Sequence, residues 1–179
     1  MSSTARALLP TPDAGFDQPF EMLLACHERV ERMLALLDRL ALHLDSHGAD
    51  DQALDAAKQV MRYFDQAAPS HHEDEERHVI PLLAKLQPAL AQQLLDEHQE
   101  MGQQWQLVQS DLAALSPQQE SPAPQAAARW AAFAALYRRH LLAEEELAFV
   151  AVRPLLSSQD LQDMGQEMAL RRGASLPRL

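Results

Sequence analysis

The chain has 179 residues and a formal net charge of −11, and 47% of its residues are hydrophobic although only 5% are aromatic. This length fits one domain that buries its own core, and a mixture dominated by Ala, Leu, Gln and Glu predicts an all-α protein. The acidic balance argues against nucleic-acid binding, because phosphate recognition needs clustered Lys and Arg, and it suits cations instead.

The single cysteine, Cys26, cannot form an intramolecular disulfide or a Cys-rich metal site, and we expect it to be a buried packing residue. A lone thiol is also compatible with a reducing compartment. The first apolar run is too short for a signal peptide, and no stretch approaches the roughly 20 apolar residues of a membrane span. We therefore expect a cytoplasmic protein that contacts no membrane.

The first predicted helix carries a histidine on its apolar face. Residues 1–17 are rich in Ser, Thr and Pro and lack an apolar period, so they predict an irregular N-terminal arm. Beyond them, apolar residues repeat every three or four positions, and His27 occupies a position on the same face. Residues 45–51 predict a turn, which places His43 and His47 at a fraying helix end, where we expect exposure rather than metal binding.

A second helix is predicted for residues 52–86, where the apolar period resumes. Its expected inner stripe consists of Leu54, Val60, Phe64, Ala68, Val79, Leu82 and Leu86. Pro69 should kink this helix, because a proline cannot donate its backbone hydrogen bond. Pro81 predicts a second bend or the end of the helix.

The densest group of metal-ligating side chains lies in this helix, at residues 70–78. Residues four apart share a helix face, so His71 can chelate together with Glu75, and His72 together with Glu76. Periodicity places His72 and Glu75 nearest the centre of the apolar stripe and therefore does not choose between the two pairs. The other charges of the run are expected on a solvated face: Glu73, Asp74 and Arg77.

The third and fourth helices repeat the pattern of a histidine on the apolar face. After Pro88, the third carries His98, and the proline-rich residues 116–124 predict a loop. Along the fourth helix we expect an inner stripe of Trp130, Phe133, Tyr137, His140, Glu144, Leu147 and residues 150–152. A weaker amphipathic helix is predicted for residues 159–172.

Four long helices with short connections predict an antiparallel four-helix bundle, whose interior can hold a metal site built from facing helices. The inward polar groups are His27, His71 or His72 with its glutamate, His98, His140 and Glu144. Imidazole and carboxylate without thiolate suit iron, manganese or zinc, and two glutamates could bridge two metal ions. Such a ligand set would leave coordination positions open for dioxygen, peroxide, nitric oxide or water.

These motifs resemble the hemerythrin family, in particular the bacterial domains named for a His-His-Glu cation-binding motif. The resemblance covers residues 18–155. It rests on His27, on the His-x-x-x-Glu-Glu runs at residues 71–76 and 140–145, and on the pair Glu97-His98. It implies a hemerythrin-like bundle that holds two non-haem iron ions bridged by carboxylates. The C-terminal helix and tail, residues 156–179, lie outside it.

The resemblance also bears on the ligands, because the family usually chelates through the first glutamate of the doublet in the second helix. The implied metal ligands are therefore His27, His71, Glu75, His98, His140 and Glu144, with His72 and Glu76 as the alternative register. Manganese or zinc could replace iron in the same set of ligands.

Two departures from the oxygen-carrying hemerythrins bear on function. Those proteins have a second histidine four residues from the first in the third helix, where this chain has Leu94 and Gly102. They also place a bridging aspartate where this chain has Glu144. These differences argue against reversible oxygen carriage and favour a non-catalytic protein that senses or handles dioxygen, nitric oxide or iron.

Other functions use the same residues differently. The first alternative is a di-iron enzyme that acts on peroxide or nitric oxide. A zinc site for hydrolysis would need an open coordination position and a nearby base, which the sequence allows without indicating. In a metal-free helical interaction module the histidines would be satisfied core residues. We expect the protein to be a monomer or a homodimer. A sensor of this kind would act through a separate protein partner.

Overall fold

The computed structural model describes residues 15–117 and 124–174, and all regular structure in these ranges is helical. In chain order the elements are α1 (Pro19–His47), α2 (Asp51–His78), α3 (Ile80–Leu86), α4 (Pro88–Ala113), α5 (Pro124–Ala143), the π-helical turn η1 (Glu144–Ala148), α6 (Phe149–Val152), the short turn η2 (Arg153–Leu155) and α7 (Ser158–Arg171).

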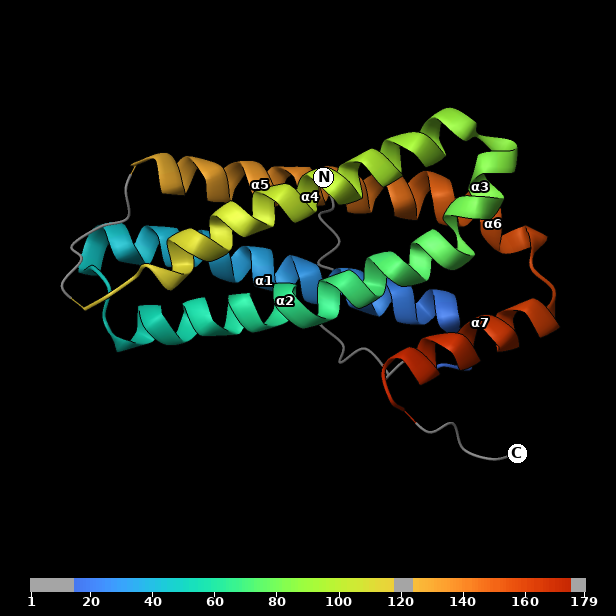
Figure 1. The fold of residues 1–179 in the computed structure, drawn as a ribbon, viewed down its shortest axis with the longest axis horizontal. Coiled ribbons are helices and arrows are strands. Elements are labelled where there is room, and N and C mark those ends of the chain that lie inside the picture. The colour runs from blue at the N-terminus through green and yellow to red at the C-terminus, as the bar shows by residue number, and fades with distance from the viewer. Residues whose placement is uncertain (1–14, 118–123, 175–179) are drawn as a thin grey trace, which may run out of the picture.

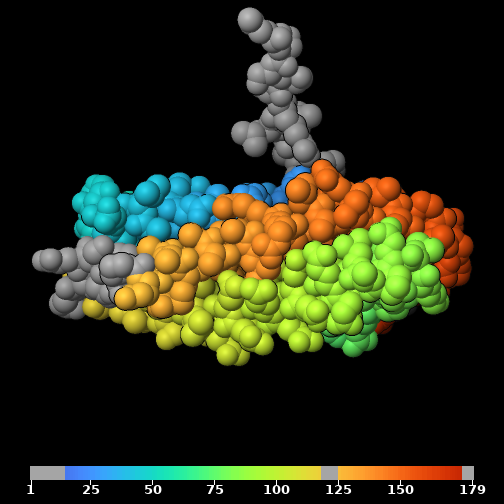
Figure 2. Space-filling model, turned by 90° about the horizontal axis from the view of Figure 1, so that it is seen from above, coloured from blue at the N-terminus to red at the C-terminus, as the bar shows by residue number. Residues whose placement is uncertain are grey.

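The long helices alternate in direction along one axis, as expected for an antiparallel bundle (Figure 1). α1 packs against α2 and α5, and α4 packs against the same two helices, which closes the bundle. Viewed from above, α5 lies beside α4 (Figure 2). The predicted fold class, an all-α four-helix bundle followed by a C-terminal helix, is confirmed. None of the described helices could span a membrane.

Local signals set the junction between α1 and α2. α1 ends where Gly48 adopts a φ of 73°, which glycine reaches without steric cost. The Asp50 carboxylate then caps α2 by accepting a hydrogen bond from the N–H of Ala53 at 2.9 Å. His43 contacts the same carboxylate and stacks on His47. These two histidines lie at the turn, His47 exposed and His43 half-buried, apart from the buried histidines.

The second predicted helix is divided in the structure. α2 continues through Pro69, and its axis changes direction near the middle of its length (Figure 1). It ends at His78, and Pro81 lies in the first turn of α3, where a missing N–H costs nothing. Leu86, expected on the inner stripe, is exposed at the end of α3. The single helix predicted for residues 52–86 is therefore corrected to two helices.

The fourth helix contains a π-helical turn that the apolar period of its sequence does not predict. The N–H of Phe149 donates to the carbonyl of Glu144, five residues earlier, so one extra residue enters the turn. The extra residue shifts the face that points inward. Leu147 is 50% exposed and Val150 is 65% exposed, whereas Ala148, Phe149 and Val152 are buried. Leu147 and Val150, predicted for the inner stripe, are therefore exposed, whereas Val152 is buried as predicted.

Two hydrophobic clusters fill the bundle, with a layer of buried polar residues between them. On α1, Leu23 belongs to one cluster and Val30 to the other, and His27 lies between them. The same order recurs on the other helices, where the intervening polar residues are His71 and Glu75, His98, and His140 and Glu144. Each long helix therefore contributes polar side chains to one level of the bundle.

α7 lies along α1 and α2, close to the predicted range of residues 159–172 (Figure 1). A capping box between Ser157 and Asp160 starts it. Gly165 allows a close approach to the start of the bundle, because a Cβ there would lie 1.7 Å from the carbonyl oxygen of Phe16. Of the arm expected for residues 1–17, only residues 15–17 are described, and they are not helical.

Candidate metal centre

Six of the buried polar side chains form two overlapping groups of potential metal ligands. One group consists of His27, His71, Glu75 and Glu144, and the other of Glu75, His98, His140 and Glu144. Within each group, one ligand atom per residue lies within 4.8 Å of the others. The two groups share Glu75 and Glu144, and all six side chains are buried.

The carboxylate of Glu75 lies between two pairs of histidines, His27 with His71 and His98 with His140. Its Oε1 lies 3.4 Å from Nε2 of His27 and 3.2 Å from Nε2 of His71. Its other oxygen, Oε2, lies 3.6 Å from Nε2 of His98. One oxygen therefore faces each pair, which is the arrangement that a bridging carboxylate requires.

Glu144 repeats this arrangement from the opposite side of the bundle. Its Oε2 lies 3.4 Å from Nε2 of His27, and its Oε1 lies 3.3 Å from Nε2 of His140 and 4.0 Å from Nε2 of His98. Because η1 begins at this residue, the spacing of four from His140 is kept within regular α-helix. The π-helical turn changes the phase only after both side chains are placed.

Further glutamates hold the outer nitrogens of the histidine rings. Oε1 of Glu145 lies 2.9 Å from Nδ1 of His27, and Oε1 of Glu76 lies 2.9 Å from Nδ1 of His98. A carboxylate on one ring nitrogen fixes the orientation of the ring and leaves the other nitrogen free to bind metal. In both Glu-Glu doublets, the second glutamate thus contacts a histidine from a different helix.

The third such contact joins Oε2 of Glu97 to Nδ1 of His140 at 2.8 Å. Glu97 and both doublets belong to the sequence motifs, but spacing along the chain predicted no role for Glu97 or for the second glutamate of the fourth-helix doublet. The repeated Glu-Glu doublet was the available signal for such a role. Adjacent residues of a helix point in different directions, so the second glutamate cannot join the first in chelation and is free to contact another side chain.

Several atoms of the centre lack a hydrogen-bond partner among the described residues. They are both ring nitrogens of His71, Oε2 of Glu75 and both carboxylate oxygens of Glu144. Buried polar groups are normally paired, because an unpaired one loses its hydration without compensation. A cation bound between these atoms would use their free lone pairs, so the donor set fits an oxygen- and nitrogen-ligated metal.

Without a metal, the two central carboxylates differ in proton affinity. Burial and the nearby Glu144 raise the pKa of Glu75 to about 8. Burial also acts to raise the pKa of Glu144, but the charges of His140 and His27 outweigh it and hold that pKa well below its usual value. Burial lowers the pKa of His71 well below the usual value. In the metal-free protein, a proton on Glu75 thus neutralises the negative charge of this carboxylate, which a bound cation would otherwise offset.

The alternative second-helix residues lie beside the two groups but belong to neither. The ring of His72 stacks on that of His98 at 4.1 Å, and its Nε2 lies 3.4 Å from the hydroxyl of Tyr137. The carboxylate of Glu76 is 44% exposed and contacts the outer nitrogen of His98. In the structure, His71 and Glu75 lie within the groups of potential ligands. Their role as metal ligands stays a prediction.

Asp74 corrects the expectation of a solvated charge. Its side chain is fully buried, and its two oxygens accept hydrogen bonds from Arg171 and Arg172 at the end of α7. Arg171 also pairs with Glu167 at 2.8 Å. Because Asp74 directly precedes Glu75, these ion pairs tie the C-terminal helix to the turn of α2 that carries a shared carboxylate.

Comparison with known proteins matches residues 18–152 to the model of the hemerythrin HHE cation binding domain. The chain is also 34% identical over 169 residues to an uncharacterized protein of Haemophilus influenzae. That alignment covers 92% of this chain and 96% of the relative. The family match includes every residue of the two ligand groups and ends at the last residue of α6, before α7.

Proposed function

Because this chain belongs to the hemerythrin family of HHE cation-binding domains, we propose that its buried centre binds two non-haem iron ions. We further propose that the protein senses or handles dioxygen, nitric oxide or iron in the cytoplasm. One pair of histidines, His27 and His71, would bind the first ion, and the pair His98 and His140 the second. Glu75 and Glu144 would bind both.

The observation that carries this proposal is the orientation of the two shared carboxylates. Glu75 and Glu144 each direct one oxygen toward each pair of histidines. With two divalent ions bound, the four imidazoles would be neutral, and the two carboxylates would offset part of the charge of the ions. Manganese and zinc fit the same donor atoms, so the metal itself must be measured.

Two histidines and two shared carboxylates around each ion leave coordination positions open. When bound, iron would supply a redox-active centre able to take a diatomic ligand or peroxide. Two buried aromatic rings lie beside histidines at this level of the bundle. Phe149 stacks on His27 at 5.3 Å, and Tyr137 lies beside His72.

Iron content per chain in two variants tests the shared ligands. His71→Ala removes a ligand of one ion, so we expect iron content to fall from about two ions per chain to about one. Glu144→Ala removes a ligand of both ions and should lower the content further. Glu146→Ala, at the exposed residue two positions after Glu144, serves as the control. Full iron content in both centre variants would refute the ligand assignment.

Turnover measurements separate binding from catalysis. The iron-loaded protein is mixed with an excess of hydrogen peroxide or nitric oxide, and consumption is followed over time. A sensing or handling protein should react at most once per centre and then stop. Sustained consumption that is lost in Glu144→Ala would instead make the protein a di-iron enzyme.

A further inference from the structure

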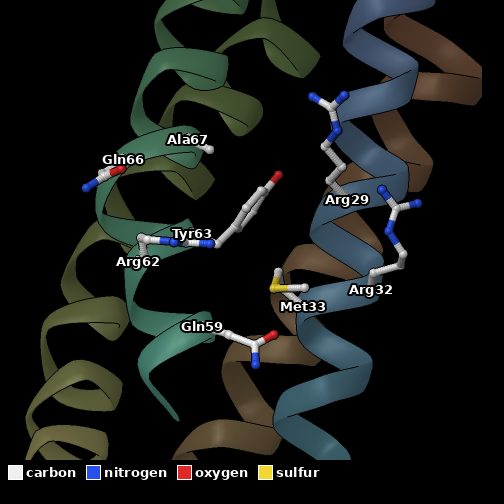
Figure 3. Close-up of a pocket in the computed structure, with 8 residues that line it drawn as sticks. All are labelled: Arg29, Arg32, Met33, Gln59, Arg62, Tyr63, Gln66 and Ala67. Atoms are coloured by element: carbon white, nitrogen blue, oxygen red, sulfur yellow. The ribbon is translucent and has the colours of Figure 1, made fainter. Parts of the chain in front are cut away.

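A groove of about 350 Å³ lies between α1 and α2, apart from the metal centre. Figure 3 shows that α1 contributes Arg29 and Arg32 and that α2 contributes residues across the gap. The polar side chains that line it are Arg29, Arg32, Gln59, Arg62, Tyr63 and Gln66. Every one of these side chains can donate hydrogen bonds, and none of them is acidic.

Among the described residues, the arginines of this groove pair less closely with carboxylates than most other arginines do. In the described part of the chain, Arg29 and Arg62 have no carboxylate within 4.0 Å, and Arg32 reaches Glu28 only at 4.0 Å. Arginines elsewhere pair closely with acidic groups, among them Arg77, Arg129, Arg138, Arg153 and Arg172. In a chain of net charge −11, three arginines and no acidic residue line this groove.

The walls of the groove also include apolar surface. Met33 and Ala67 line it, and the ring of Tyr63 extends between the two helices (Figure 3). The hydroxyl of Tyr63 donates to the carbonyl of Cys26 at 3.3 Å, which holds the ring in place. A ligand that fits this surface has a negatively charged group for the arginines and a small apolar part for the walls.

We propose that the groove binds a small organic oxyanion, either a phosphate ester or a carboxylate. Guanidinium groups recognise both kinds of anion through paired, charge-assisted hydrogen bonds. Gln59, one turn before Arg62 on α2, adds an amide donor that points into the gap (Figure 3). Arg29 lies two residues beyond His27, so an anion bound here would lie beside the helix turn that supplies a candidate metal ligand.

Calorimetric titration of the full-length protein tests this site with two probes. Phenyl phosphate represents the phosphate esters, and phthalate represents the carboxylates. We expect one molecule of at least one probe to bind per chain, with an affinity that falls as salt is added. Each of Arg29→Gln and Arg62→Gln should weaken binding about tenfold, as expected for the loss of one charge-assisted hydrogen bond.

Arg39→Gln is the matched control, because Arg39 is exposed on α1 but does not line the groove. The affinity of this variant for the probes should equal that of the unaltered protein. The proposal is wrong if neither probe binds at millimolar concentration. It is equally wrong if Arg39→Gln weakens binding as much as Arg29→Gln, since the attraction would then be diffuse. Neither outcome depends on whether the candidate metal centre binds metal.

Discussion

The carboxylate of Glu145 lies 2.9 Å from Nδ1 of His27, although 118 residues separate them along the chain. The neighbouring Glu144 faces the other nitrogen of the same ring, Nε2, at 3.4 Å. One Glu-Glu doublet thus contacts a single imidazole from both sides. The outer glutamate orients the ring, and the inner one lies with it in the candidate metal centre.

Glu145→Gln should weaken iron binding by a factor of about 10 to 100, because the amide holds His27 less firmly and makes it a poorer ligand. Competition with a chelator of known affinity measures the change. Glu146→Gln alters the next, exposed residue and should leave the affinity unchanged. Equal affinities for both variants would show that Glu145 does not act through His27.

The metal-free protein should lose stability as pH rises from 6.5 to 9. Burial lowers the pKa of His140, but the charge of Glu144 outweighs it and raises the pKa from 6.5 to about 9. The pKa of Glu75 is raised to about 8. In this window the folded state holds protons that the unfolded chain has released, so folding weakens by about 1.4 kcal/mol per pH unit for each such proton.

Urea unfolding at several pH values measures this trend. The lowered pKa of His71 acts in the opposite direction, but only below its usual value of 6.5. Iron-loaded protein should show little of the decline, because the metal keeps its ligands deprotonated. A metal-free protein whose stability rose between pH 6.5 and 9 would contradict the raised pKa values of Glu75 and His140.

Asp74→Asn should destabilise the fold by about 3 kcal/mol, because it leaves Arg171 and Arg172 beside a neutral group. Thermal or urea unfolding measures the loss. The control is Asp55→Asn on the same helix, where an exposed pair with Lys58 contributes less than about 1 kcal/mol. Similar losses for both variants would mean that the ion pairs with α7 carry no special weight.

The π-helical turn is tested by two identical substitutions. Val152→Ala removes methyl groups from a fully buried side chain and should cost about 2 kcal/mol in unfolding free energy. Val150→Ala changes a side chain that is 65% exposed and should cost less than about 0.5 kcal/mol. A larger loss for Val150→Ala than for Val152→Ala would mean that Val150 is the buried residue. The inward face would then not shift after Glu144.

The helices and the inward histidines could be predicted because each histidine occupies an apolar position of a 3.6-residue period. His27 and His98, for example, lie between residues of the two hydrophobic clusters. Periodicity could not choose between His71 and His72, because the apolar stripe of the second helix is wide enough to include both. That choice depends on how α2 is rotated against its neighbours, which is a property of the packed bundle.

Other features depended on contacts between distant segments. Asp74 lies within a charged run that looks solvated, and only the docking of α7 brings Arg171 and Arg172 to it. The π-helical turn after Glu144 is a different case, because it is local but leaves no signal in the apolar period of the sequence. Predictions from spacing assume regular helix and therefore fail beyond such a turn.

Metal content is the most direct test of the proposed centre. The protein is purified without oxygen, its metals are determined by elemental analysis, and its visible spectrum is recorded as air is admitted. We predict about two iron ions per chain and a new visible absorption on oxidation, because two ligand groups share Glu75 and Glu144. One zinc ion per chain, or no metal after reconstitution with iron, would contradict the di-iron centre.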